Sequence, residues 1–337
     1  MSLPHGKISP NLLSEIVFKY LGSKRQDLVL GPKKGEDAAI VKIGSQLIAI
    51  SCDPISGALS RIGWLAVHVA SNDVATTGTR PLWFLPCILL PNGTTSKNIE
   101  DICVQMHRAA ETLDVAIIGG HTEITPGIDH PLIIGFAIGV IEGGKYITSS
   151  GAKPKDDIIL TKSVGLEGSA ILATDRGKEI SSKFGESFVK RVEGFFDKIS
   201  ILNEALTAIE IGGVTSMHDP TEGGIAGGLH EVSDASKTGF RVYEEKIRVE
   251  PETKKIASFF QIDPLQLISS GSLLITCNPQ SSKKIIETLR TKGIQSSIIG
   301  EVLEDSERRI IVREGGLAED VPYPESDALW TVLDKKI

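Results

Sequence analysis

The chain has 337 residues, 41% hydrophobic and 23% charged, with a formal net charge of −7. These values are ordinary for a globular protein of about two domains. The acidic balance argues against nucleic acid as the main partner, because duplex binding needs a basic surface. Glycine is enriched at 34 residues, and the plentiful apolar residues argue against disorder as the reason.

The four cysteines form no C-x-x-C pair, which argues against a zinc knuckle or a redox dithiol. Such thiols fit a reducing compartment. The longest apolar run, about 132–141, is too short to span a bilayer, and the N-terminus lacks an apolar signal core. We therefore expect a cytoplasmic protein without a membrane segment.

Strands and helices alternate along the chain, which predicts an α/β or α+β fold. In the first half of the chain, the sequence pattern predicts strands over 47–51, 86–90, 115–118 and 132–141. The first of these ends at Cys52-Asp53-Pro54, and 115–118 has the composition of a buried strand. The pattern also predicts helices over 61–76 and 96–113, the second capped by Ser96. A polar run with Gly and Pro near 145–157 predicts a boundary between domains 1–150 and 151–337. The second half predicts strands over 158–161, 298–302 and 309–312, and helices over 186–210 and 281–292.

The usual nucleotide motifs, G-x-x-x-x-G-K-[ST] and a well-placed G-x-G-x-x-G, are absent from the sequence, which argues against a P-loop ATPase or a classical dinucleotide enzyme. Instead, carboxylates stand beside small residues at five places. They lie in Gly35-Glu36-Asp37, Ser51-Cys52-Asp53, Asn72-Asp73, Gly119-Gly120-His121-Thr122-Glu123 and Asp219-Pro220-Thr221-Glu222-Gly223-Gly224.

Each segment also has a purely structural interpretation. Asn72 and Asp73 can lie on a solvated helix face. However, position 77, four residues after Asp73, is not a cation, so an Asp inside the helix needs a partner from elsewhere. A lone histidine such as His121 is usually structural. Asp219 is predicted as a helix N-cap with Pro220 at the first helical position, but capping does not explain glycines at 223, 224, 227 and 228, which let another backbone pack closely. Together, the five segments indicate a site in which Asp carboxylates hold a divalent cation and the cation holds phosphates.

The ordered set of motifs resembles the superfamily of aminoimidazole ribonucleotide synthetase, thiamine-phosphate kinase, selenophosphate synthetase and the hydrogenase maturation factor HypE. The matching segments are G-E-D-A-A at 35–39, Asp53, N-D-x-A-x-x-G-x-x-P at 72–81, G-G-x-T at 119–122, and 151–161, 165–168, 269–271 and 299–302. Asp219-Pro220-Thr221 with Gly223-Gly224 is most similar to the HypE branch.

The resemblance implies a two-domain PurM-like α/β (α+β) fold. The N-domain sheet would form a β-barrel across a homodimer, the C-domain would be an α/β sandwich, and ATP would lie in the cleft with its phosphates on Mg²⁺. It implies metal binding by Asp37, Asp53 and Asp73, a phosphate contact by Asn72, and a nucleotide cleft lined by Gly119, Gly120 and Thr122 and faced by Asp219. We also predict that Gly223 and Gly224 bind the nucleotide and that Asp219 and His121 are the candidate catalytic residues.

Three departures bear on the substrate. HypE proteins end in a cysteine tail whose thiol carries the reacting group, whereas this chain ends Leu333-Asp334-Lys335-Lys336-Ile337 and its last cysteine is Cys277. We therefore expect no cyanide-ligand synthesis through such a thiol. Glu222 stands where HypE usually has Arg, and a carboxylate there would repel a phosphate at a helix start. His121 replaces a possible metal carboxylate, for which Glu123 could substitute.

We expect an ATP-dependent enzyme that phosphorylates or dehydrates an amide-like group on a small molecule or on a maturation partner protein. The alternatives are a non-enzymatic nucleotide-binding assembly module, and a purine-pathway synthetase or small-molecule kinase of the same superfamily. No residue stands out as a general base, and His121 and His218 are only candidates.

Overall fold

The computed structural model describes residues 3 and 5–334. Contacts divide the chain into two units. The N-terminal unit comprises 27–31 and 38–146, and the C-terminal unit comprises the residues up to 26, 32–37 and those from 147 onward. The predicted domains, 1–150 and 151–337, remain a prediction, but contacts assign the early segments to the C-terminal unit. Asp37 therefore belongs to a different unit from Asp53 and Asp73.

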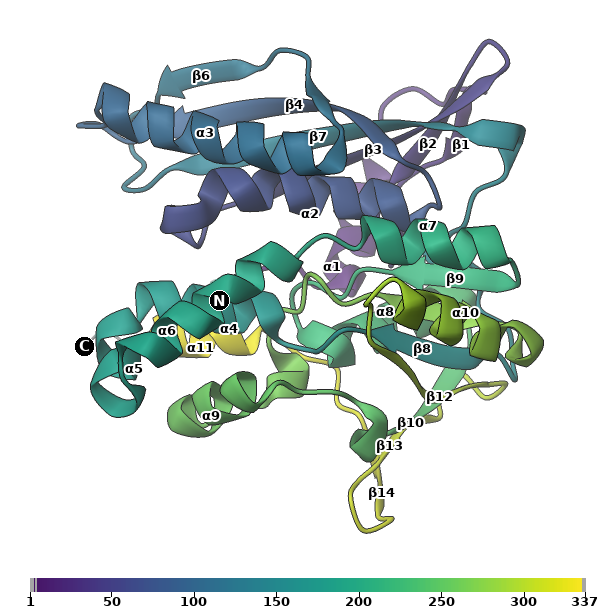
Figure 1. Cartoon of the computed structure of the whole chain (residues 1–337). Helices are drawn as coiled ribbons and strands as arrows, with labels where there is room; N and C mark the ends of the chain where they lie inside the picture. Colours follow the sequence, from purple (N-terminus) through teal and green to yellow (C-terminus); the bar gives the residue numbers. More distant parts are fainter. Residues whose placement is uncertain (1–2, 4, 335–337) are drawn as a thin grey trace. The chain divides into compact units, whose positions relative to one another are not determined.

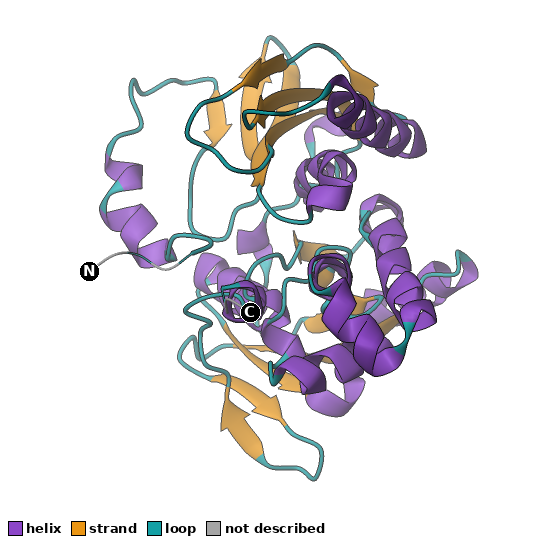
Figure 2. Cartoon of the chain, turned by 90° about the vertical axis from the view of Figure 1, so that its left-hand side faces the viewer, coloured by secondary structure: helices purple, strands orange, loops and turns teal. Residues whose placement is uncertain are grey.

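The N-terminal unit is built on a seven-stranded sheet in the order β1-β2-β3-β7-β4-β5, with β6 also paired to β4. Its strands are β1 (Leu28–Leu30), β2 (Ala39–Ile43), β3 (Gln46–Ile55), β4 (Pro81–Leu90), β5 (Ala116–Ile117), β6 (His121–Ile124) and β7 (Leu132–Ile141). Helices α2 (Ile62–Thr76) and α3 (Ser96–Leu113) lie on the same side of the strands (Figure 1, Figure 2). The helix-facing residues of β4 and β7 are buried and the alternate ones are half-buried, except for the exposed Trp83, because successive side chains of a strand point to opposite faces.

Several predicted elements of this unit are confirmed, namely the helix over 61–76, the helix over 96–113 and the strand over 132–141. Three details are wrong. The strand expected to end before Cys52 continues to Ile55, so Asp53 lies inside β3. Thr95, not Ser96, caps α3, because its side chain accepts from the backbone N–H of Asn98. The strand expected over 115–118 is the short β5, and both of its residues are exposed because β5 lies at a sheet edge.

The C-terminal unit contains a second seven-stranded sheet in the order β14-β13-β10-β12-β8-β11-β9. Its strands are β8 (Asp157–Thr161), β9 (Val214–His218), β10 (Gly239–Tyr243), β11 (Leu274–Cys277), β12 (Ser296–Leu303), β13 (Arg309–Val312) and β14 (Ala318–Asp320). Its helices are α1 (Pro10–Glu15), α4 (Leu166–Asp175), α5 (Gly177–Phe184), α6 (Glu186–Glu193), α7 (Leu202–Ile211), α8 (Gly224–Ser236), α9 (Pro251–Phe260), α10 (Pro279–Thr291) and α11 (Ala328–Leu333).

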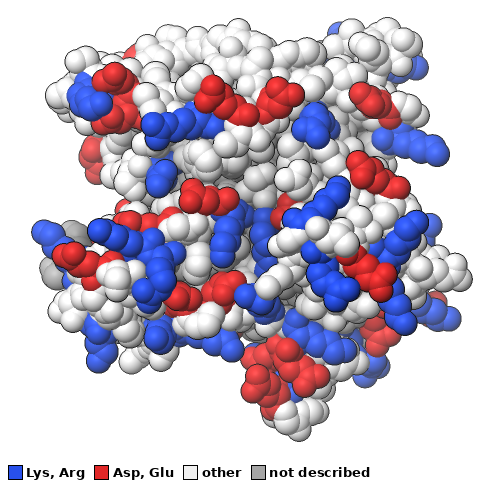
Figure 3. All heavy atoms as spheres, viewed as in Figure 1, with Lys and Arg blue, Asp and Glu red and all other residues white. Residues whose placement is uncertain are grey.

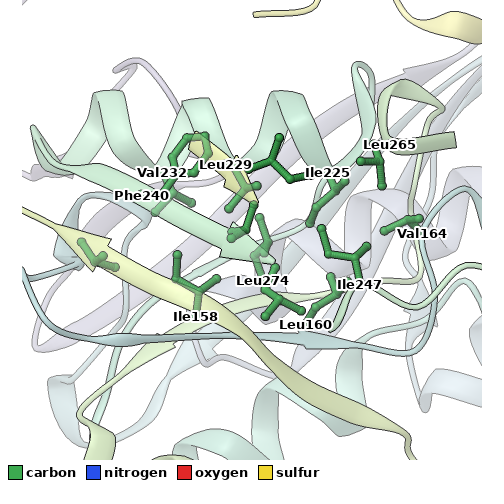
Figure 4. Close-up of a cluster of buried hydrophobic side chains, with 14 of the residues drawn as sticks. Ile158, Leu160, Val164, Ile225, Leu229, Val232, Phe240, Ile247, Leu265 and Leu274 are labelled. Atoms are coloured by element: carbon green, nitrogen blue, oxygen red, sulfur yellow. The ribbon is translucent and has the colours of Figure 1, made fainter. Parts of the chain in front are cut away.

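Helix α8 covers one face of this sheet through a buried cluster (Figure 4). Ile225, Leu229 and Val232 of α8 meet alternate residues of the strands, including Ile158 and Leu160 of β8. Ile159 of β8 is equally buried but points to the other face, where α7 and α10 pack on each other and on the strands. All residues of β8 after Asp157 are therefore buried, as in a strand covered on both faces.

Two helix predictions in this unit are wrong. The helix expected over 186–210 is broken, because α6 ends at Glu193, a 3-10 turn follows over Gly194–Lys198, and α7 begins only at Leu202. The apolar period continues across this break because the turn also buries its aromatic side chains. Asp219 is not an N-cap, since α8 begins at Gly224 with Gly223 at the cap position.

The predicted strands over 158–161, 298–302 and 309–312 and the helix over 281–292 are confirmed, with slightly longer bounds for most of them. Within residues 3 and 5–334, no helix has the length and apolar content needed to cross a membrane. Figure 3 shows acidic and basic side chains interspersed over the viewed face, without one large field of a single sign. The terminal residues 335–337, part of the sequence contrast with the HypE tail, lie outside the described residues.

Candidate functional site

The register of the N-terminal sheet aligns predicted site residues in one row across four strands. Asp53 of β3 lies opposite Gly135 of β7, and Gly135 lies opposite Pro86 of β4. Because Cys87 pairs with His121, Pro86 lies beside Gly120. Three strand spacings of about 4.8 Å separate Asp53 from Gly120 by about 14 Å. The sheet thus presents Asp53 and Gly120 on the same face.

Asp73 approaches this face from helix α2. Its carboxylate accepts a hydrogen bond from the Ser51 hydroxyl at 2.9 Å. Ser51 and Asp53 are two residues apart on β3, so both side chains point toward α2. Asn72 and Asp73 are 1% and 8% exposed, which contradicts the interpretation of a solvated helix face. Asp53 is half-buried, and its carboxylate makes no hydrogen bond or ion pair with another described residue.

The double glycine owes its conformation partly to packing. Gly119 and Gly120 have φ of +148° and +140°, and a Cβ on Gly120 would lie 2.3 Å from the Pro86 carbonyl oxygen. Glycine is therefore required at 120 by the neighbouring strand, whether or not a ligand approaches.

His121 and Thr122 follow on β6 and point to opposite faces of the sheet. Thr122 pairs with the buried Ile88 and shares the face of Asp53. His121 pairs with Cys87 and points to the other face. There its ring forms a 3.0 Å contact with Glu123, and its side chain is 63% exposed. The structure therefore groups Thr122, but not His121, with the Asp53 and Asp73 side of the sheet.

Asp37 enters a buried chain of alternating charges in the C-terminal unit. Its carboxylate lies 3.0 Å from Nδ1 of His218, the last residue of β9. Nε2 of His218 lies 2.8 Å from Glu231 on α8. The second oxygen of Glu231 accepts a hydrogen bond from the Lys7 ammonium at 2.7 Å. Four residues from four separate segments thus form one charge-compensated network.

The network fixes the protonation of its members. Burial opposes a charge on His218, but the Asp37 and Glu231 carboxylates outweigh it and raise the pKa of His218 to about 10. Burial also opposes a charge on Glu231, yet Lys7 and His218 lower the pKa of Glu231 to about 2. Both groups are therefore charged at neutral pH, and each compensates its neighbours.

Two glycines that follow Asp219 allow close packing. Gly224 admits the backbone of a distant segment, and Gly228 admits the ring of His218 from the charge network. A Cβ on Gly224 would lie 2.6 Å from the Leu265 carbonyl oxygen, and one on Gly228 would lie 3.2 Å from the His218 ring. The prediction that these glycines admit a second backbone is confirmed at Gly224, whereas side chains are the nearest neighbours at Gly223 and Gly228. The N–H of Gly223 donates to Asp327 at 2.7 Å, and that of Gly224 to the Thr221 carbonyl at 3.0 Å.

Asp219 and Glu222 occupy different settings in the loop before α8. Asp219 is 1% exposed and follows His218 directly. Glu222 is half-buried and accepts a hydrogen bond from the Lys7 backbone N–H at 2.6 Å. This carboxylate therefore holds the N-terminal segment at the start of α8.

Two further acids lie near this loop. Burial raises the pKa of Glu167 to about 7, against the opposing effect of Ser270, and the carboxylates of Asp327 and Glu222 raise it further. Burial also raises the pKa of Asp327 to about 7, although the N–H groups of Leu329, Gly223 and Ile268 oppose this. Both acids are partly protonated near neutral pH.

Sequence reasoning missed Lys7, Glu231 and Ser51 and undervalued His218. Glu231 carried a usable signal, because it is an acid among the apolar residues Leu229 and Val232 of one helix. Lys7 carried none, because it lies 224 positions from its partner. Among the described residues, no group of three or more His, Cys, Asp or Glu is arranged to hold a metal ion. Mg²⁺ needs only one or two protein carboxylates when phosphates complete its shell.

Comparison with known sequences places the chain in a family. Residues 35–141 match the N-terminal domain of AIR synthase related proteins, and residues 153–313 match the C-terminal domain. The carbamoyl dehydratase HypE of Cupriavidus necator is 30% identical over 256 residues, which cover 75% of this chain and 70% of that protein. The chain belongs to the AIR synthase-related family. Within it, the chain is HypE-like.

Solved structures support the same fold. The chain matches a structure of a HypE–HypF complex with a TM-score of 0.78 at 24% identity, over 93% of this chain and 99% of that one. It also matches HypE in complex with ATP with a TM-score of 0.74 at 23% identity, over 97% and 98%. The predicted two-domain PurM-like α/β fold is confirmed by these similarities.

Proposed function

We propose that this AIR synthase-related protein is an ATP- and Mg²⁺-dependent enzyme of the HypE-like branch. It phosphorylates or dehydrates an amide-like group on a small molecule or on a partner protein. The observation that carries the proposal is the convergence of Asp53 and Asp73 on one sheet face. A HypE structure contains ATP and another contains HypF, which supports a nucleotide and a partner protein here.

The residues present fit magnesium. Asp53 offers an unshared, half-buried carboxylate, and Ser51 orients the carboxylate of Asp73. Hard oxygen donors of this kind suit Mg²⁺, which when bound supplies electrostatic stabilisation of phosphate charge. Asn72 and Thr122 are proposed to bind the nucleotide, and Gly119, Gly120, Gly223 and Gly224 to bring backbone near it. Catalysis would rest on positioning and charge compensation.

In the C-terminal unit, His218 is proposed to orient Asp37 as a third carboxylate, as outer-shell partners orient metal ligands elsewhere. Asp219, buried beside it, is proposed to help position the reacting group. His121 is retained only as a weaker candidate, since it points to the opposite sheet face. Burial raises the pKa of the Cys277 thiol to about 12, so Cys277 is not proposed as an acceptor.

The decisive experiment is Mg-ATP turnover, with phosphate release followed for wild type and Asp53→Asn. We expect a loss of at least about 100-fold, the scale on which one electrostatic contact to a reacting phosphate acts. Asp101→Asn on the exposed face of α3 is the matched control and should retain full turnover. Equal turnover by Asp53→Asn and wild type would refute the metal assignment. Mg-ATP binding without turnover, tested with candidate substrates, would favour the assembly module.

The apolar sheet face that α2 and α3 do not cover supports a homodimer. Leu85, Leu89, Ile134, Phe136 and Ile138 are half-buried there, and such a continuous apolar face marks an interaction surface. We propose that two copies pair through it and close the barrel expected from the resemblance. Phe136→Glu should convert dimer to monomer in light scattering, whereas Thr112→Glu on α3 should not. A wild-type monomer would contradict the dimer.

The state of the cysteines supports a proposal for the compartment. The four cysteines are free, which suits a reducing environment, and we propose the cytoplasm.

A further inference from the structure

A groove of about 600 Å³ in the C-terminal unit lies outside the proposed site. It forms where the end of β8 and the start of β12 meet α9, α10 and the segment after β10. Its wall contains five cationic side chains and one carboxylate, Glu245. In a protein of net charge −7, this local excess of positive charge sets the groove apart.

Two of the cations are already compensated. Lys162 pairs with Glu204 at 2.7 Å and donates to two backbone carbonyls. Arg248 pairs with Glu250 at 3.2 Å. These contacts shape the groove but leave little charge for a ligand.

The other three cations lack a carboxylate partner within the described residues. Lys246 lies 4.5 Å from the centroid of the Tyr243 ring. Lys254 and Arg290 are exposed and belong to no ion pair of the described chain. Several arginines elsewhere in this unit are paired, as Arg309 is with Asp234 and Arg313 with Glu244, whereas the exposed Arg308 belongs to no ion pair of the described chain.

The groove also has an apolar part. Ile247 and Ile286 line it together with the cations. A volume of this size fits a small-molecule ligand.

We propose that this groove binds a phosphorylated small molecule, with Lys246, Lys254 and Arg290 holding the phosphate. Arg and Lys side chains are the groups that recognise phosphate oxygens through charged hydrogen bonds. An apolar part of the ligand would lie on Ile247 and Ile286. The site does not depend on the proposed ATP-dependent activity.

The test is calorimetric titration of the full chain with inorganic pyrophosphate at fixed ionic strength and with EDTA. EDTA removes the contribution of any metal-dependent site. We expect saturable binding to wild type, weakened about tenfold by Lys254→Gln and by Arg290→Gln, the effect of losing one charged hydrogen bond. Lys284→Gln removes an equally exposed cation of α10 outside the groove and should bind like wild type.

Three outcomes would overturn the proposal. They are no saturable binding to wild type, an equal loss in Lys284→Gln, and unchanged affinity in the double variant Lys254→Gln/Arg290→Gln. Binding that is absent in EDTA, appears when Mg²⁺ replaces EDTA and is lost in Asp53→Asn would place pyrophosphate in the N-terminal unit instead. Melting temperatures of all variants establish that each is folded.

Discussion

The buried charge network makes a sharp prediction for Glu231→Gln. The substitution keeps the shape of the side chain but removes the charge that lies between Lys7 and His218. The pKa of Glu231 falls from an ordinary 4.5 to about 2 on folding. At about 1.4 kcal/mol per pKa unit, the charged carboxylate contributes about 3 kcal/mol to the free energy of unfolding. For a unit of this size, that loss lowers the Tm by about 6–12 °C.

The stability difference between wild type and Glu231→Gln should depend on pH in a defined direction. A lowered pKa means that the stabilisation is complete above pH 4.5 and is lost as pH falls through 2. The gap between wild type and Glu231→Gln should therefore be about 3 kcal/mol at pH 7 and about 1 kcal/mol at pH 3. Urea unfolding at the two pH values measures it.

Two controls isolate the network. Glu325→Gln removes an exposed carboxylate that lines the same cavity as Lys7 and Glu231 and should stay within about 0.5 kcal/mol of wild type. Lys7→Met should cost less than about 1 kcal/mol, because Lys7 is 48% exposed and solvent screens its charge. Hydrogen exchange of residues 5–9 should rise in both Glu231→Gln and Lys7→Met. A Glu231→Gln protein as stable as wild type, or a gap that does not change with pH, would refute the reasoning.

Other substitutions test packing and the raised pKa values. Gly120→Ala places a Cβ 2.3 Å from the Pro86 carbonyl oxygen at positive φ, so we expect a loss of about 3 kcal/mol, from clash and strain together. Gly127→Ala, also at positive φ but in open space, should cost only about 1 kcal/mol, and calorimetry that found equal losses would contradict the clash. The raised pKa of Glu167, about 7, means that stability falls as pH rises from 4.5 through 7. Glu167→Gln should reduce that fall in melting curves without removing it, because the raised pKa of Asp327, about 7, contributes in the same direction. The exposed Glu186→Gln should leave the fall unchanged, and a wild-type profile in Glu167→Gln would exclude Glu167 as a source.

Sequence reasoning identified regular elements best where a single local pattern decided them. The strand Leu132–Ile141 and the helix Ile62–Thr76 have the predicted bounds to within one residue. It misplaced the start of α8, because Asp219 and Pro220 imitate a capping signal while the chain makes a further turn before Gly224. The sequence pattern also predicted one continuous helix where the structure has α6 and α7. The apolar spacing of 186–210 is the same whether Gly194–Lys198 forms α-helix or a 3-10 turn.

The sequence by itself determined the family, the alternation of strands and helices, and the short list of carboxylates and glycines, because these are recorded in neighbouring residues. Only the tertiary structure decided which of them meet. Strand register set Asp53 in a row with Gly120 and turned His121 to the opposite face. Folding brought Lys7 across 224 positions to Glu231 and gave Asp37 a histidine partner. Contacts between distant segments depend on register and packing, and no local pattern encodes either.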